Sequence, residues 1–143
     1  MDLKQNIIGE IGEQLVVVEL LKSGFKEVYR ANSKTQKGWD IVVITEKNKI
    51  IRIQVKTTFL DNNSTNNSFT VEENYDFLVI VVFKLSDNET EYFCLKKETV
   101  EKIKGSEKKI AISKKKNGRK SVRDDIRECQ VIKKDWTKKL EIE

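Results

Sequence analysis

The chain has 143 residues, of which 36% are charged and 38% are hydrophobic, and it contains neither Pro nor His. This length supports one hydrophobic core of ordinary size and the charges are of both signs, so we expect a single domain over residues 1–143 and exclude a multidomain assembly or a disordered chain. Without histidine, any hydrolytic chemistry must depend on carboxylates, lysine or a metal-bound water.

The formal net charge of +5 is unevenly distributed along the chain. Residues 1–95 carry 11 basic and 14 acidic side chains, whereas residues 96–143 carry 17 and 9. A basic C-terminal third suits a polyanionic partner such as nucleic acid, although a solvated lysine-rich surface would have the same composition. The charge by itself leaves both interpretations open.

The two cysteines and the N-terminus indicate the compartment. Cys94 and Cys129 are isolated thiols without CxxC spacing, so we expect them to be small buried hydrophobic residues in a reducing environment. The N-terminal residues lack the apolar region of a signal peptide, and no segment approaches the roughly 18 apolar residues that a membrane span needs. We therefore expect a cytoplasmic protein that does not associate with membranes.

The first half of the chain predicts a helix followed by three strands. Apolar residues recur at near-helical spacing from Ile7 to Ser23, and Gly24 is a typical helix stop. The strands are expected over residues 27–32, 39–45 and 50–58. The polar residues 46–49 predict a turn that joins the last two strands into a β-hairpin.

The second half predicts one buried strand among shorter elements. Residues 60–68 are rich in Asn, Asp and Ser, which predicts a flexible surface loop. Residues 77–85 are almost continuously apolar, as is typical of a central strand covered on both faces. The remaining elements are expected to be strands over 91–96 and 109–113, a short helix over 97–104, and helical segments over 122–128 and 135–140.

Three polar residues of the predicted hairpin are expected to converge. Asp40 lies near the start of the second strand, and Gln54 and Lys56 lie on the third strand. Residues two apart on a strand project from the same face, and the hairpin turn can bring Asp40 alongside them. A carboxylate, an amide oxygen and an ammonium group would then lie together.

This order of residues resembles the PD-(D/E)XK nuclease superfamily, in the variant whose third motif position is Gln, as in some group I intron homing endonucleases. The resemblance covers residues 7–58 and rests on Gly-Trp-Asp at 38–40 and Gln-Val-Lys-Thr-Thr at 54–58, which follow a helix that carries Glu. It implies an α/β fold of the restriction-endonuclease-like kind, in which a mixed central β-sheet is flanked by helices.

The resemblance also implies which residues hold a metal. Asp40 takes the place of the family's metal-binding Asp, and Gln54 that of its acidic or Gln ligand. The main-chain carbonyl of Val55 is implied as a further ligand. The helix Glu of the family is most plausibly Glu13, which would bind a second ion or accept a hydrogen bond from a water, and Glu10 lies one helical turn earlier as a second candidate.

The implied activity is hydrolysis of DNA phosphodiester bonds with Mg²⁺ or Mn²⁺. A carboxylate and a neutral carbonyl suit Mg²⁺, which otherwise keeps waters or takes phosphate oxygens. A bound ion lowers the pKa of a water and neutralises charge on the phosphoryl group, while Lys56 would orient that water or stabilise the transition state. Because Gln54 is neutral, metal affinity should be weaker than with an acid, and one ion could suffice where two are usual.

Each of these residues also has a purely structural interpretation. Asp40 could begin a strand in solvent, and the polar residues of strand 50–58 could form the wet face of a half-buried antiparallel strand. Glu10 and Glu13 could be helix-start carboxylates that interact with the macrodipole. Trp39 and Trp136 are more typical of packing anchors than of stacking platforms.

Contact with DNA is a separate expectation. The basic residues around Gly118, over 114–120, are interpreted either as a mobile loop that contacts the phosphate backbone or as a solvated turn. The residues expected to contact phosphates are Lys34, Gln36, Lys37, Lys114, Lys115, Lys116, Arg119 and Lys120.

The expected partner is duplex or branched DNA. One active site cuts one strand, so cleavage of both strands implies a homodimer or homotetramer. Two alternatives remain open: a catalytically inactive nucleic-acid-binding module of the same fold, and an interaction or subunit protein whose basic surface is incidental.

Overall fold

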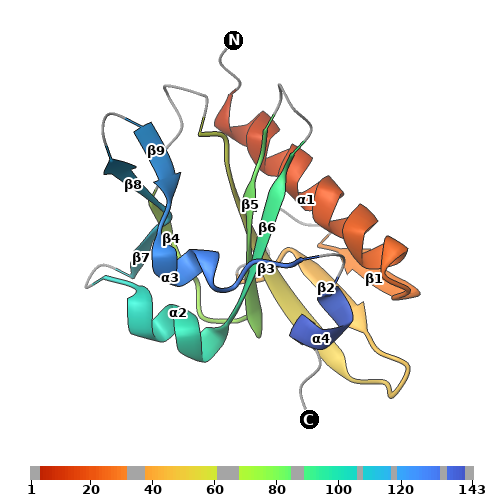
Figure 1. The fold of residues 1–143 in the computed structure, drawn as a ribbon. Helices are drawn as coiled ribbons and strands as arrows, with labels where there is room; N and C mark the ends of the chain where they lie inside the picture. Colours follow the sequence, from red (N-terminus) through yellow and green to blue (C-terminus); the bar gives the residue numbers. More distant parts are fainter. Residues whose placement is uncertain are drawn as a thin grey trace.

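A computed structural model describes residues 4–31, 38–60, 68–84, 89–105, 108–116, 119–132 and 135–140. Its central element is a five-stranded sheet in the order β1-β2-β3-β5-β6, with helices against both faces (Figure 1). The elements in chain order are α1 (Gln5–Lys22), β1 (Glu27–Arg30), β2 (Ile41–Ile44), β3 (Ile50–Thr58), β4 (Ser68–Thr70), β5 (Phe77–Val82), β6 (Glu91–Lys96), α2 (Lys97–Ile103), β7 (Lys109–Ala111), β8 (Ser113–Lys116), β9 (Arg119–Val122), α3 (Asp124–Arg127) and α4 (Trp136–Leu140).

The sheet is mixed, as predicted, because its strands pair in both directions. The expected hairpin is confirmed: β2 and β3 are antiparallel, with Ile41 opposite Ile53. β3 then runs parallel to β5, which itself pairs antiparallel with β6. All six residues of β5 are buried, as its continuous apolar sequence predicted for a central strand.

Helix α1 ends where the sequence predicts. Gly24 has φ +101, a left-handed conformation that favours glycine over residues with a Cβ. The N–H of Gly24 donates to the carbonyl of Leu21 at 3.1 Å, and that of Phe25 donates to the carbonyl of Leu20 at 3.3 Å. These bonds satisfy carbonyls that the helix end would otherwise leave unpaired.

α1 lies unusually close to β3. A Cβ added at Gly12 would lie 1.7 Å from Oγ1 of Thr57, so only glycine fits at this helix position without a rearrangement. Thr57 is 5% exposed, and its hydroxyl has no hydrogen-bond partner among the described residues. The contact sets the height of α1 above the sheet, and with it the position of Glu13.

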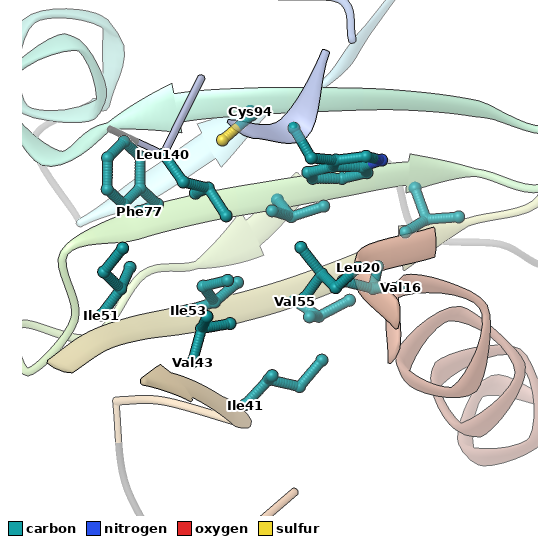
Figure 2. Close-up of a cluster of buried hydrophobic side chains, with 13 residues drawn as sticks. Val16, Leu20, Ile41, Val43, Ile51, Ile53, Val55, Phe77, Cys94 and Leu140 are labelled. Atoms are coloured by element: carbon teal, nitrogen blue, oxygen red, sulfur yellow. The ribbon is translucent and has the colours of Figure 1, made fainter. Parts of the chain in front are cut away.

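Two hydrophobic clusters form the core, one on each face of the sheet. Figure 2 shows the first, in which Val16 and Leu20 of α1 and Leu140 of α4 meet Ile53 and Val55 of β3. The second lies beneath α2 and α3 and includes buried residues of β5, β6, β7 and β9. Both faces of the central strands are therefore covered.

The tryptophans pack as their structural interpretation predicted. Trp136 is fully buried, lies 5.7 Å from the ring of Tyr92 edge to face, and donates to a carboxylate oxygen of Glu19 at 3.4 Å. It joins α4 to α1 and to the sheet. Trp39 packs against the second cluster.

The solvent-exposed interpretation of strand 50–58 is wrong for two of its polar residues. Gln54 is 4% exposed and Thr58 is fully buried. Because β3 is a central strand, Gln54 and Lys56 lie in register with Leu78 and Ile80 of the second cluster instead of facing water. Arg52 and Lys56 are half-buried.

The described residues of the basic segment near the C-terminus, 113–116 and 119–122, form strands and not a loop or a turn. β8 and β9 pair antiparallel, with Lys116 opposite Arg119, so the segment is a β-ribbon. The two residues between these partners are Asn117 and Gly118, a dipeptide typical of tight hairpins, which is the sequence signal that predicts this element.

The helix-start interpretation of Glu10 and Glu13 is also wrong, because α1 begins at Gln5 and has no acidic residue in its first turn. Between β3 and β5, the described residues contain strand β4 and no helix. Most of the loop predicted over residues 60–68 lies outside the described residues. The second face of the sheet is covered instead by α2 and α3, which follow β6.

Cys94 and Cys129 are free thiols, buried and half-buried respectively. Burial raises the pKa of Cys94 to about 12, so this thiol stays protonated and inert, as expected of a small buried hydrophobic residue. Within the described parts of the chain, no helix is long and apolar enough to span a membrane.

Candidate active site

Asp40 lies at the point where the ladder between β2 and β3 ends. Its backbone N–H donates to the carbonyl of Ile53 at 2.8 Å, and its carbonyl accepts from Ala31 at 2.9 Å. Its side-chain Oδ2 accepts the N–H of Val55 at 2.7 Å, in the peptide group that joins Gln54 to Val55. The expected convergence of Asp40 with this part of β3 is therefore present.

Gly38, two residues before Asp40, allows the chain to pass close to Asn74. Gly38 has φ +99, and a Cβ there would lie 2.7 Å from the Cβ of Asn74 and 2.9 Å from its carbonyl oxygen. No L-residue fits this conformation and this space without strain. The Gly-Trp-Asp motif thus holds Asp40 by backbone packing from one side and by strand hydrogen bonds from the other.

Gln54 has a buried side-chain oxygen, Oε1, that lacks a hydrogen bond within the described part of the chain. Leaving a buried acceptor unpaired costs about 1–3 kcal/mol, so proteins rarely retain one without a ligand, an ion or a water to bind it. Gln54 directly precedes Val55, whose N–H donates to Asp40.

Lys56 supplies a positive charge to the same site. Its Nζ lies 6.0 Å from the centre of the Phe69 ring, and its charge opposes the rise in the pKa of Asp40 that burial causes. Glu13 approaches from α1, where the negative charge of Asp40 contributes to raising its pKa. The charge of Asp40 thus interacts with those of Glu13 and Lys56, while Gln54 is linked to Asp40 through the N–H of its neighbour Val55.

The site contains one residue that sequence reasoning missed. Arg30, the last residue of β1, contacts Glu10 through Nη2 at 2.7 and 2.8 Å, and the same nitrogen contacts Glu13 at 3.1 Å. Its charge also opposes the rise in the pKa of Asp40 that burial causes. A single arginine at a strand end has no distinctive sequence signal, since only the pairing of β1 with β2 brings it beside Asp40.

Burial dominates the electrostatics of the two carboxylates nearest the sheet. It raises the pKa of Asp40, while the N–H of Val55, Lys56 and Arg30 act in the opposite direction. It also raises the pKa of Glu13, together with the charge of Asp40 and against the hydrogen bond from Arg30. The pKa of exposed Glu10 is instead lowered, chiefly by its hydrogen bond from Arg30.

We expect Asp40→Asn to stabilise the chain at pH 7. Burial holds the folded-state pKa of Asp40 above its ordinary value of 3.8, so the folded chain retains this proton to higher pH than the unfolded chain does. Ionised Asp40 therefore lowers the free energy of unfolding at pH values above its folded-state pKa. This loss disappears as the pH falls toward the pKa of Asp40 in the unfolded chain. Asn cannot ionise and still offers an acceptor to Val55.

The measurement is thermal unfolding by circular dichroism between pH 4 and pH 8. The Tm of the variant should exceed that of the wild type at pH 7, and the difference should shrink as the pH approaches 4. Glu46→Gln, in the exposed turn of the same hairpin, is the control and should show no such trend. A difference that grows on acidification would contradict the argument.

The donor set at this site fits a hard divalent cation with few acidic ligands. Asp40 offers a carboxylate, and Gln54 offers a buried amide oxygen that no described residue contacts by a hydrogen bond. No cluster of three or more His, Cys, Asp or Glu side chains suited to a metal occurs in the described part of the chain. An ion here would therefore need neutral oxygens and waters besides Asp40.

The residues predicted to contact DNA are only partly described. Lys34, Gln36 and Lys37 lie outside the described residues. Lys114 is exposed and pairs with Oδ1 of Asp124 at 2.8 Å. Lys115, Lys116, Arg119 and Lys120 are placed in the β8–β9 ribbon by their backbone.

Comparison with known proteins gives the class of fold and one named neighbour. No protein-family model matches the chain, and no curated protein sequence matches it. The fold is of the mixed α/β class and has a similar solved structure. The bacterial homing endonuclease I-Ssp6803I is similar with a TM-score of 0.60, over 90% of this chain and 89% of that one, at 17% sequence identity. The predicted fold class is confirmed: a five-stranded mixed sheet flanked by helices.

Proposed function

We propose that this chain is a metal-dependent DNA endonuclease that hydrolyses phosphodiester bonds with Mg²⁺ or Mn²⁺. The observation that carries the proposal is the buried Oε1 of Gln54, which has no hydrogen-bond partner among the described residues and lies one residue before the N–H that Asp40 accepts. Its place on a fold similar to that of a homing endonuclease supports the assignment. The Asp, Gln and Lys positions match the Gln-x-Lys variant of the PD-(D/E)XK pattern.

In this proposal Asp40 and Gln54 hold the ion, with the main-chain carbonyl of Val55 as a further ligand. The ion, when bound, lowers the pKa of a water and stabilises charge that develops on the phosphoryl oxygens. The bond between Val55 N–H and Oδ2 of Asp40 fixes the carboxylate, so that Oδ1 is the oxygen offered to a ligand. A carboxylate that is already oriented loses little entropy on binding.

Lys56 and Glu13 act on the water and the phosphate. Lys56 is a compact positive charge beside Asp40, suited to orient the attacking water or to stabilise the charged transition state. Glu13 lies on the α1 side of the site, where it binds a second ion or accepts a hydrogen bond from a water. Both roles require groups held by rigid elements, which α1 and β3 supply.

Duplex or branched DNA is the proposed partner. The β8–β9 ribbon carries Lys114, Lys115, Lys116, Arg119 and Lys120, and a two-stranded ribbon has dimensions that fit the major groove. Cleavage of both strands would require two sites, and hence a homodimer or homotetramer. The proposed compartment is the cytoplasm.

The proposal is tested by nicking of supercoiled plasmid and branched DNA with Mg²⁺, Mn²⁺ or EDTA. We expect metal-dependent cleavage by the wild type, and a loss of about 10²–10³-fold in Lys56→Met, because a fixed charge at the reacting phosphate is removed. Methionine retains the apolar stem that lies near Phe69. Lys47→Met, in the exposed hairpin turn, is the matched control and should cleave like the wild type.

The outcomes separate the proposal from its alternatives. Equal cleavage by Lys56→Met and the wild type would remove Lys56 from the site. Absence of cleavage with DNA binding that weakens as salt rises would indicate a binding module of the same fold. Absence of both cleavage and DNA binding would favour an interaction or subunit protein.

A further inference from the structure

We infer that Arg30 occupies the position of a second cation in this site, so that the site takes one divalent ion, at Asp40 and Gln54. This inference rests on the proposed function and goes beyond it by fixing the number of ions and assigning a role to Arg30. Of the two roles open to Glu13, it selects contact with water over ligation of a second ion.

Arg30 lies in the place where a second ion would meet its acidic ligands. Its Nη2 contacts both carboxylate oxygens of Glu10, at 2.7 and 2.8 Å, and Oε1 of Glu13, at 3.1 Å. These are charge-assisted hydrogen bonds to the carboxylates of α1 on the side of Asp40. A second ion ligated by Glu13 would have to displace the guanidinium from this carboxylate.

The strand pairing restrains Arg30 at this position. Its backbone lies opposite Ile41 in the β1–β2 ladder, and the N–H of the next residue, Ala31, donates to the carbonyl of Asp40 at 2.9 Å. The Arg30 side chain is 36% exposed, and its Nε is buried without a partner among the described residues. The guanidinium can change rotamer, but its Cα stays beside Asp40.

The charges of the cluster agree with one ion. Glu10, Glu13 and Asp40 supply three negative charges when ionised, and Arg30 and Lys56 supply two positive ones, while Gln54 supplies none. Arginine remains charged at every accessible pH. The cluster's net charge is therefore −1 without an ion, +1 with one divalent ion and +3 with two, so a second ion would leave it strongly positive before any phosphate is bound.

The test counts bound ions, not turnover. The full chain is titrated with Mn²⁺, and free Mn²⁺ is followed by electron paramagnetic resonance. We expect about one ion per chain for the wild type and none tightly held in Asp40→Asn. Arg30→Gln frees Glu10 and Glu13 from the cation and should raise the count to about two. Arg30→Lys keeps the charge and should stay at one.

The control is Arg127→Gln, which removes an arginine charge from an ion pair with Glu91 at the opposite edge strand, β6, and should stay at one. Circular dichroism confirms that each variant is folded. A wild type that binds two ions, or an Arg30→Gln variant that still binds one, would overturn this inference while leaving the metal-dependent nuclease intact. A wild type that binds no ion would overturn the proposed function and this inference together.

Discussion

Asp40→Asn is expected to abolish metal-dependent cleavage while the chain stays folded, with a rate loss of at least about 10³-fold. The amide oxygen of Asn can still accept the N–H of Val55, which Oδ2 of Asp40 accepts at 2.7 Å, so the strand geometry is retained. The negative charge is lost, and Gln54, the other side chain proposed to hold the ion, is neutral. The ion would then have no charged ligand there.

The measurement is plasmid nicking with Mg²⁺ and Mn²⁺, together with thermal unfolding of the same preparations. Glu46→Gln removes a carboxylate from the exposed turn of the same hairpin and should leave cleavage unchanged. A variant of Asp40 that is more stable but inactive would identify a functional residue. The buried charge of Asp40 lowers stability, and such a residue is retained because the activity needs it. Metal-dependent cleavage retained by Asp40→Asn would remove Asp40 from the site.

Gly12→Ala is expected to destabilise the chain by about 1–3 kcal/mol. Its Cβ would lie 1.7 Å from Oγ1 and 2.7 Å from Cβ of Thr57, so α1 must move away from β3. That shift would also displace Glu13, which neighbours Gly12 on the helix. Denaturant unfolding gives the change in free energy, and nicking assays at a temperature where the variant is folded give the effect on the site.

Gly9→Ala is a matched control on the same helix with the opposite expected sign. A Cβ at Gly9 meets nothing within 4 Å, so alanine should stabilise α1 by about 0.5–1 kcal/mol through helix propensity. Thr57→Ala in the Gly12→Ala background removes the closest contact and should recover part of the loss. Destabilisation of similar size at both glycines would indicate a general sensitivity of α1 and not the contact with Thr57.

The elements of the first 60 residues could be predicted because their signals are local. The apolar repeat of α1, the glycine after it and the turn between β2 and β3 each depend on residues close in the sequence. The prediction for the basic segment around Gly118 was wrong although a local hairpin signal, Asn-Gly, is present there. Lysine has low strand propensity, which favours a loop at this segment. The antiparallel pairing of β8 with β9 outweighs that preference.

The sequence by itself predicted the mixed α/β fold class, through its resemblance to a known family. It also predicted that Asp40 approaches the strand that carries Gln54 and Lys56, because a short hairpin joins the two segments. Only the tertiary structure decided that Gln54 is buried and that its Oε1 finds no hydrogen-bond partner in the described part of the chain. This burial depends on the pairing of β3 with β5, which are separated in the sequence. The tertiary structure also decided that Arg30 meets the carboxylates of α1 and that Gly12 meets Thr57. Such contacts join segments whose approach is set by packing of the whole core, which no local pattern encodes.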